Sequence, residues 1–404
     1  MTRSDRNDSS TSPDATFPRR DWIVLPALGL LTICFVFLVT ELAARRMFPV
    51  SKTLMASCLV LNDPSTGTRA IPNSVCWEKS PESVGEEYRF NSCGHRAGME
   101  CGPKPQGTYR IVMLGSSIAL GERVRREDSF AALLPMELSR LSGHKVELYN
   151  EAMGWSFAGS TALRFDNALN AQPDLILWPL TVNDIQGSTF TPFVPEKIGF
   201  SRSMTLREKA WLRIKAAFSS RSVLTSLSDV FSHTRTAVLV RHYMYESQSQ
   251  YVNAALKSRD GDFGFLKTEP GEKWKVQLQQ FEGVAAGMER RAKAANIPFV
   301  ATYVPIRAQA AMISMGNWPA GFDPYLIDNE LRSIIERHGG IYISILHDYR
   351  SVPNPEQTYY PVDGHPNAAG HALIARLLAK ELTSGAVPAL KAPERAQAEL
   401  ERGK

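Results

Sequence analysis

Five short apolar stretches, separated by helical segments, constrain this chain more than any other feature. They lie at residues 110–114, 145–149, 175–179, 297–304 and 341–345. Apolar strands that alternate with helices predict a mostly parallel sheet covered on both faces. Five strands suit a three-layer α/β/α sandwich of the flavodoxin type, in which active-site loops gather at the carboxyl ends of the strands.

The predicted helices fall between these strands. Asp128 and Ser129 cap a helix that runs to about residue 141, and Gly143 ends it. Further helices are expected at residues 163–169, 273–295, 323–337 and 368–382. The sandwich domain therefore extends over residues 108–384.

Other segments fall outside this alternation. Residues 41–107, with several prolines and cysteines, are expected to form an irregular lead-in that packs on the domain. Residues 187–272 interrupt the pattern and are interpreted as an insertion, able to form a lid or a substrate wall, with helical stretches at about 205–218 and 221–232. Residues 385–404 form a polar tail.

An uncharged apolar stretch near the start of the chain predicts a membrane anchor. Nineteen residues, from Trp22 to Thr40, carry no charge. As a helix they would span about 28 Å, close to the apolar thickness of a bilayer. We favour a retained anchor over a cleaved signal peptide, although Ala43-Ala44 leave cleavage open. The polar tail at residues 1–21 is expected to be cytoplasmic, because arginines are slightly more numerous before the span.

Cysteine positions support an extracytoplasmic location for the rest of the chain. Four cysteines (Cys58, Cys76, Cys93 and Cys101) lie together in the lead-in, and Cys34 lies in the apolar span. An even number after an export signal predicts two disulfides, with three connectivities open. A zinc site is the less favoured alternative, because the spacings lack close Cys-x-x-Cys pairs.

The composition is that of an ordinary globular protein, with 44% apolar and 22% charged residues. The net charge of +5 comes from scattered basic residues, so nucleic-acid binding is not expected. Apart from the less favoured zinc alternative, no pattern indicates a cofactor or a metal site, and none indicates an oligomeric state.

Three polar segments follow predicted strands or precede the last helix, where an active site would lie. Gly115-Ser116-Ser117 follows the first strand, Asn183 lies in a segment after the third, and Asp363 and His365 precede the last helix. Each has a structural alternative: a tight turn, an Asx-turn or a packed histidine. Together they supply a serine nucleophile, an oxyanion donor, and a base with a carboxylate that orients it.

These segments resemble the SGNH/GDSL hydrolase family over about residues 86–382, without the insertion. The stretch Asn91-x-x-Gly94-x-Arg96 is similar to one that precedes the domain in many membrane-associated members. The spacing of two residues between Asp363 and His365 is similar to that in alginate O-acetylation proteins of the superfamily.

The resemblance implies a role for each matching residue. Ser117 would be the nucleophile, His365 the base and Asp363 its partner. The oxyanion hole would consist of the Ser117 N–H, the Gly154 N–H and the Asn183 side chain, with Gly159 as a weaker candidate in place of Gly154.

Several neighbouring residues are expected to have supporting roles or to depart from the family. Ser116 stands where relatives carry aspartate, and Thr181 where they carry glycine. Asp184 is expected to brace the loop of Asn183, and His371 to be structural.

The function implied is that of a membrane-anchored serine esterase acting outside the cytoplasm on an acyl ester of a cell-envelope glycan, with acetyl as the favoured acyl group. Two alternatives stay open at this point. One is an O-acetyltransferase with the same triad, and the other is a non-catalytic glycan-binding or scaffold protein.

Overall fold

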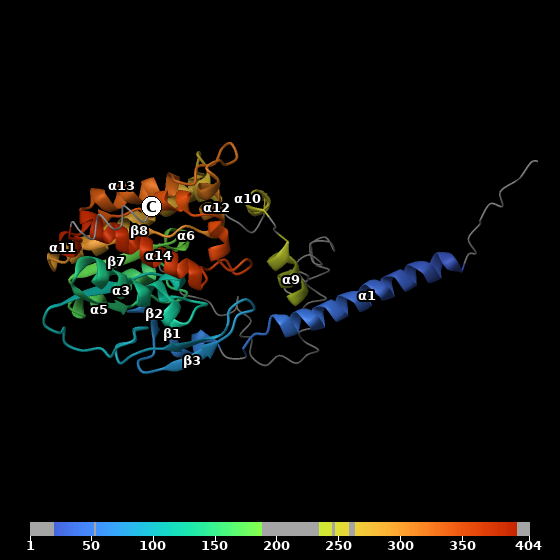
Figure 1. Ribbon diagram of the computed structural model, residues 1–404, viewed down its shortest axis with the longest axis horizontal. Helices are drawn as coiled ribbons and strands as arrows, with labels where there is room; N and C mark the ends of the chain where they lie inside the picture. Colours follow the sequence, from blue (N-terminus) through green and yellow to red (C-terminus); the bar gives the residue numbers. More distant parts are fainter. Residues whose placement is uncertain (1–19, 52–53, 188–233, 245–246, 258–262, 394–404) are drawn as a thin grey trace, which may run out of the picture.

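The computed structural model describes residues 20–51, 54–187, 234–244, 247–257 and 263–393 of the 404-residue chain. These residues form a layered α/β body and one long helix that projects from it (Figure 1). The helical stretches expected at 205–218 and 221–232, most of the N-terminal tail and the end of the C-terminal tail lie outside the described residues.

A five-stranded parallel sheet forms the centre of the body. Its strands are β5 (Thr108–Met113), β6 (Lys145–Asn150), β7 (Leu175–Leu180), β8 (Phe299–Tyr303) and β9 (Ile341–Tyr342). They lie in the order β6-β5-β7-β8-β9, and every neighbouring pair is parallel. Counted within the sheet this is 2-1-3-4-5, the flavodoxin order. The predicted fold class is confirmed, and the carboxyl ends of β5 and β7 lie side by side.

Helices cover both faces of this sheet (Figure 1). On one face α3 (Phe130–Ser142) packs against α14 (Ala368–Glu381). On the other, α11 (Glu272–Ala294) packs against α4 (Ala158–Leu163) and α13 (Leu326–Arg337). The ring of Phe281 on α11 stacks on buried Trp178 of β7, with centroids 5.4 Å apart. The strands are mostly apolar because both faces of the sheet meet helices.

The structure also refines several predicted elements. The helix expected at 163–169 is divided into α4 and α5 (Phe165–Asn170) at Arg164, which is buried and donates a hydrogen bond to the carbonyl oxygen of Thr68. The strand expected at 341–345 pairs only over Ile341–Tyr342. The described start of the C-terminal tail packs Val387 and Leu390 into the core.

Shorter elements complete the described chain. The α-helices are α2 (Ser117–Leu120), α6 (Val182–Gln186), α9 (Arg235–Tyr243), α10 (Gln248–Lys257) and α12 (Arg307–Met315), the last of which the sequence pattern did not indicate. The single-turn elements are η1 (Met55–Cys58), η2 (Arg126–Asp128), η4 (Phe263–Leu266), η5 (His347–Ser351), η6 (Pro355–Thr358), η7 (Leu382–Ala386) and η8 (Pro388–Leu390).

The lead-in contains regular structure, contrary to the irregular segment that we expected. It forms two antiparallel hairpins, β1 (Leu59–Asp63) with β2 (Gly67–Ala70), and β3 (Val75–Glu78) with β4 (Glu86–Arg89). The disulfides Cys58–Cys76 and Cys93–Cys101 confirm the prediction of two bridges. The first bridge joins η1 to β3 and so connects the two hairpins. These strands did not stand out in the sequence because each spans only four or five residues.

The projecting helix is α1 (Asp21–Met47), which contains the predicted anchor. It is long and apolar enough to cross a membrane, and a signal sequence would have the same properties. Near its end, the Glu41 carboxylate accepts hydrogen bonds from the backbone N–H and the hydroxyl of Thr236 at the start of α9. The insertion therefore contacts the end of the apolar helix.

Glu289 is a buried carboxyl group on α11, far along the chain from the polar segments singled out above. Its side chain lies against Gly340 in the loop before β9, and the residue is only 3% exposed. Burial raises its pKa from 4.5 to about 7, and the backbone N–H of Gly340 offsets this rise only in part. The folded protein therefore holds this proton at pH values where the unfolded chain has lost it.

We expect Glu289→Gln to stabilise the protein above neutral pH. The unfolded carboxyl ionises first as the pH rises, so the native state loses stability between about pH 4.5 and 7, and the variant escapes this loss. The free energy of unfolding in urea should rise by about 3 kcal/mol near pH 8 and change little near pH 4. Glu330→Gln, at an exposed position on α13, serves as the control. A destabilisation of equal size at both pH values would contradict this account.

Candidate active site

Ser117 begins α2 directly beyond the end of β5. The turn that leads to it requires glycine at position 115, where φ is +134° and a Cβ would lie 2.7 Å from the Cβ of Ala119 and 3.1 Å from the carbonyl oxygen of Pro179. The N–H of Leu114 donates to the carbonyl oxygen of Leu177 on β7. The serine is thus held at the carboxyl edge of the sheet, where it is half-buried.

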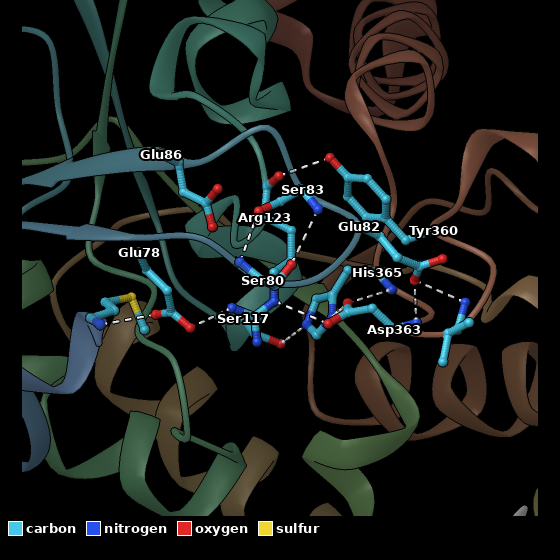
Figure 2. Close-up of polar contacts among 12 residues, drawn as sticks. Glu78, Ser80, Glu82, Ser83, Glu86, Ser117, Arg123, Tyr360, Asp363 and His365 are labelled. Carbon is cyan, nitrogen blue, oxygen red and sulfur yellow. Dashed lines mark hydrogen bonds and ion pairs between the residues drawn. The ribbon is translucent and has the colours of Figure 1, made fainter. Parts of the chain in front are cut away.

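Ser117, His365 and Asp363 form one continuous chain of hydrogen-bonded side chains (Figure 2). The Oγ of Ser117 lies 2.8 Å from Nε2 of His365. On the other side of the ring, Nδ1 of His365 lies 2.6 Å from Oδ1 of Asp363. The structure therefore brings together three residues of which the first and the last are 248 positions apart in the sequence.

A tight loop before α14 aims Asp363 and His365 in the same direction. The N–H of Tyr360 donates to the carbonyl oxygen of His365, and the N–H of Gly364 donates to the carbonyl oxygen of Tyr360. Gly364 adopts the left-handed conformation, with φ of +84°. The reversal at this glycine places the carboxylate beside Nδ1 of His365 and leaves Nε2 for the serine.

The electrostatics of the pair favour an ionised acid and a basic imidazole. Burial alone would lower the pKa of His365, but the hydrogen bond and charge of Asp363, together with the charge of Glu122, raise it above 6.5. Burial would raise the pKa of Asp363, but the contacts with His365 and the charge of Arg123 lower it to about 2. Asp363 therefore stays ionised at neutral pH and fixes the proton of His365 on Nδ1.

Arg123 is a contact of Asp363 that sequence reasoning missed. Its Nε donates to Oδ2 of Asp363 at 3.1 Å, and its Nη1 donates to Oε1 of Glu78 at 2.7 Å. A second carboxylate of the lead-in, Glu82, accepts the backbone N–H groups of Val362 and Asp363. The feature of the sequence that could have indicated this contact is the charged pair Glu122-Arg123, which follows soon after the serine turn.

Arg96 of the lead-in holds the loop that follows the serine helix. Its buried guanidinium donates to the carbonyl oxygens of Leu120, Gly121 and Val124. Arg96 itself follows an Asx-turn in which the Asn91 carboxamide oxygen accepts the N–H groups of Cys93 and His95. The Asn-x-x-Gly-x-Arg stretch thus positions the loop that carries Arg123.

Gly154 lies buried in the loop after β6, and the preceding residue ties this loop to the serine turn. The N–H of Met153 donates to the carbonyl oxygen of Gly115. A Cβ at Gly154 would lie 2.1 Å from Oε1 of Glu122 and 2.5 Å from Cε of Met55. The alternative oxyanion donor, Gly159, already donates its N–H to the carbonyl oxygen of Gly187. This favours Gly154 of the two.

Asn183 lies in the first turn of α6, with an exposed side chain. Asp184 closes a capping box at this turn, since its Oδ2 accepts the backbone N–H and the hydroxyl of Thr181, both at 2.8 Å. The hydroxyl of Ser116 lies 3.3 Å from that of Thr181 and donates to Asp184 at 3.4 Å. Ser116 and Thr181 thus tie the serine turn to the helix of Asn183, and Asp184 braces that helix as expected.

His371 has the structural role that we expected. It is fully buried, and burial lowers its pKa to about 3. Its Nδ1 accepts the N–H of Phe130, and its ring stacks on that of the same residue. Among the described residues, no group of three or more histidine, cysteine, aspartate or glutamate side chains could hold a metal ion.

Comparison with known proteins gives structural likeness only. No family model matches the chain, and no curated protein matches it. Many of its structural neighbours are esterases and acylhydrolases of the GDSL type.

Three solved structures illustrate this likeness. An α/β hydrolase from the metagenome of Lake Arreo is 14% identical, covers 70% of this chain and 97% of its own, and has a TM-score of 0.38. A variant of an acetylxylan esterase from Geobacillus stearothermophilus is 12% identical, with coverages of 68% and 94% and a TM-score of 0.37. A GDSL-like lipase from Parabacteroides merdae is 12% identical, with coverages of 71% and 100% and a TM-score of 0.37. At these low scores, function has to be argued from the geometry of this chain.

We expect Gly154→Ala to destabilise the protein, because burial restricts the movement of Glu122 and Met55 away from the new methyl group. The loss in the free energy of unfolding should be about 1–3 kcal/mol, as measured in urea. Gly283→Ala is the matched control. It lies at an exposed position within α11 with open space around its Cβ, and it should stabilise by about 0.5–1 kcal/mol. Equal stability of Gly154→Ala and the parent would disprove the close packing at this loop.

Proposed function

We propose that this chain is a serine-dependent ester hydrolase that works through an acyl-enzyme. The observation that carries the proposal is the hydrogen-bonded chain from Ser117 through His365 to Asp363. A serine hydroxyl is too weak an acid to ionise at neutral pH, and a hydrogen-bonded imidazole supplies the base that it lacks. The carboxylate on the far side of the ring orients that base and stabilises the imidazolium that forms.

The reaction follows from these contacts in two steps. Ser117 Oγ attacks the ester carbonyl while its proton passes to Nε2 of His365. When the tetrahedral intermediate collapses, the C–O bond to the alcohol breaks and His365 returns the proton to the departing oxygen. A water molecule then gives its proton to His365 and attacks the acyl-enzyme, and the acid is released as the proton returns to Ser117.

The oxyanion hole is proposed to contain the N–H groups of Ser117 and Gly154 and the side chain of Asn183. Each such donor typically contributes about 3–4 kcal/mol to stabilisation of the transition state. Support for this set comes from the loops: Gly154 follows Met153, which is bonded to the serine turn, and Asn183 lies between two residues that contact Ser116.

The proposed substrate is an O-acyl ester, with acetyl as the favoured acyl group, on a glycan outside the cytoplasm. The location is supported by the two disulfides, which form in oxidising compartments, and by the apolar helix α1 as a single-pass anchor. The acetyl and glycan assignments extend the expectation from the family resemblance.

We expect a fluorophosphonate probe to label the full-length protein in detergent, and Ser117→Ala to abolish the labelling. Ser116→Ala is the matched control, because it removes the neighbouring hydroxyl, whose two contacts at 3.3 and 3.4 Å are weak. The control should label at a rate within roughly tenfold of the parent. Labelling of Ser117→Ala at the parent rate would overturn the proposal.

We also expect kcat/KM for a short-chain aryl ester to fall at acidic pH. The base is the neutral imidazole, so activity is lost as the pH drops through the pKa of His365, which lies above 6.5. Asp363, with a pKa of about 2, stays ionised over this range and contributes no second step. A profile that stays flat down to about pH 5 would exclude His365 as the base.

A further inference from the structure

The acid of the triad contacts the base through one carboxylate oxygen and a residue outside the triad through the other. Oδ1 of Asp363 contacts His365, and its second oxygen, Oδ2, accepts a hydrogen bond from Nε of Arg123 at 3.1 Å. The side chains of Asp363 and Arg123 are only 18% and 17% exposed, so solvent screens this contact weakly. Figure 2 shows Arg123 between Asp363 and Glu78 of the lead-in.

We propose that Arg123 is a positioning residue of the active site, and that the lead-in, through Glu78 and Glu82, holds both Arg123 and the loop of Asp363 in place. This inference rests on the proposed function of the triad. The hairpin of β3 and β4 then helps to orient the catalytic residues, in addition to its packing role.

Arg123 is held through its guanidinium and through its backbone. Nη1 donates to Oε1 of Glu78, whose Oε2 accepts the N–H of Met55. The backbone carbonyl oxygen of Arg123 accepts the hydroxyl of Tyr360, and its N–H donates to the hydroxyl of Tyr88. The residue adopts φ of +73°, an unfavourable conformation for a side chain with a Cβ, which these contacts maintain.

The strand that carries Glu78 is cross-linked by a disulfide. Glu78 ends β3, and the Cys58–Cys76 disulfide joins this strand to η1, which begins with Met55. The carboxylate of Glu78 therefore bridges two elements that a disulfide already holds together. Because Glu78 is already held in place, its ion pair with Arg123 costs little conformational entropy.

Glu82 holds the other side of the acid loop. Its Oε2 accepts the N–H groups of Val362 and Asp363 at 2.9 and 2.8 Å, and its side chain is only 2% exposed. Its Oε1 lies 2.7 Å from Nδ1 of His242 on α9. The lead-in thus fixes the backbone of Asp363 through Glu82 and its carboxylate through Arg123.

The charge of Arg123 also acts on the base. The charged groups that shape the pKa of His365 are Asp363 and Glu122, which raise it, and Arg123, which lowers it. Buried His371 is a further titratable group coupled to His365. Loss of Arg123 should therefore raise the pKa of His365 and move the acid limb of the activity profile to higher pH.

The test compares Arg123→Met with Arg125→Met in the full-length protein. Arg125 lies two residues away in the same loop, and its exposed side chain forms ion pairs with Glu127 and Asp128. For Arg123→Met we expect kcat for an aryl acetate to fall roughly 10- to 100-fold with little change in KM, because Arg123 orients the base and does not touch substrate. The acid limb should rise by roughly half a unit to one unit. Arg125→Met should match the parent in all three quantities.

Two further measurements separate positioning from loss of fold. Arg123→Ala should regain part of its kcat in millimolar guanidinium and none in matched sodium chloride. Glu78→Gln, which leaves Arg123 in place but removes its anchoring charge, should lower kcat less than Arg123→Met does, again at constant KM. Circular dichroism of each variant monitors the fold.

The outcomes distinguish this inference from the function on which it rests. If the parent is active and Arg123→Met behaves like Arg125→Met, the positioning role is overturned and the proposal for the triad stands. A loss of kcat with no shift of the acid limb and no guanidinium rescue would also overturn it. A parent protein that neither labels at Ser117 nor hydrolyses any ester would overturn both proposals.

Discussion

The half-buried carboxylate of Asp363 is the charge around which the rest of the site is organised. Removing a carboxylate from water costs several kcal/mol unless partners replace its hydration. Here the imidazole of His365 and the guanidinium of Arg123 each contact one oxygen of Asp363. Their effect outweighs that of burial, which would raise the pKa of Asp363, and lowers it to about 2. The orientation of His365 toward Ser117 depends on this arrangement, because the ionised acid decides which ring nitrogen carries the proton.

The sheet and the lead-in contribute different parts of this arrangement. Parallel pairing of β5 and β7 brings the serine turn beside the capping box of α6, where Ser116 contacts Thr181 and Asp184. The lead-in reaches the same edge from outside the sandwich. Its Arg96 holds the backbone of residues 120–124, and its acidic residues hold the loop before α14.

The substitution at Ser116 illustrates how a local departure can be compatible with the site. Relatives implied by the resemblance carry aspartate there, and here a hydroxyl contacts the buried Asp184. Burial raises the pKa of Asp184 to about 7, even though the bonds from Thr181 and Ser116 oppose the rise. A second carboxylate at position 116 would face that group at close range, whereas serine donates to it. The hydroxyl thus suits a site that already contains one buried acid.

The sequence by itself indicated a parallel sheet covered by helices, because strand and helix periodicity is a local property. The order β6-β5-β7-β8-β9 was implied only through the flavodoxin type, since alternation alone does not decide which strands are neighbours. The sequence also indicated Ser117, Asn183, Asp363 and His365 as candidates, since turn chemistry at strand ends is visible in short segments. Only the tertiary structure decided which residues hold the acid. Glu78 and Glu82 lie in four-residue strands and turns more than 270 positions before Asp363, and no periodicity links them to it. Contacts of that kind depend on how the lead-in packs, and packing of distant segments is a property of the folded chain alone.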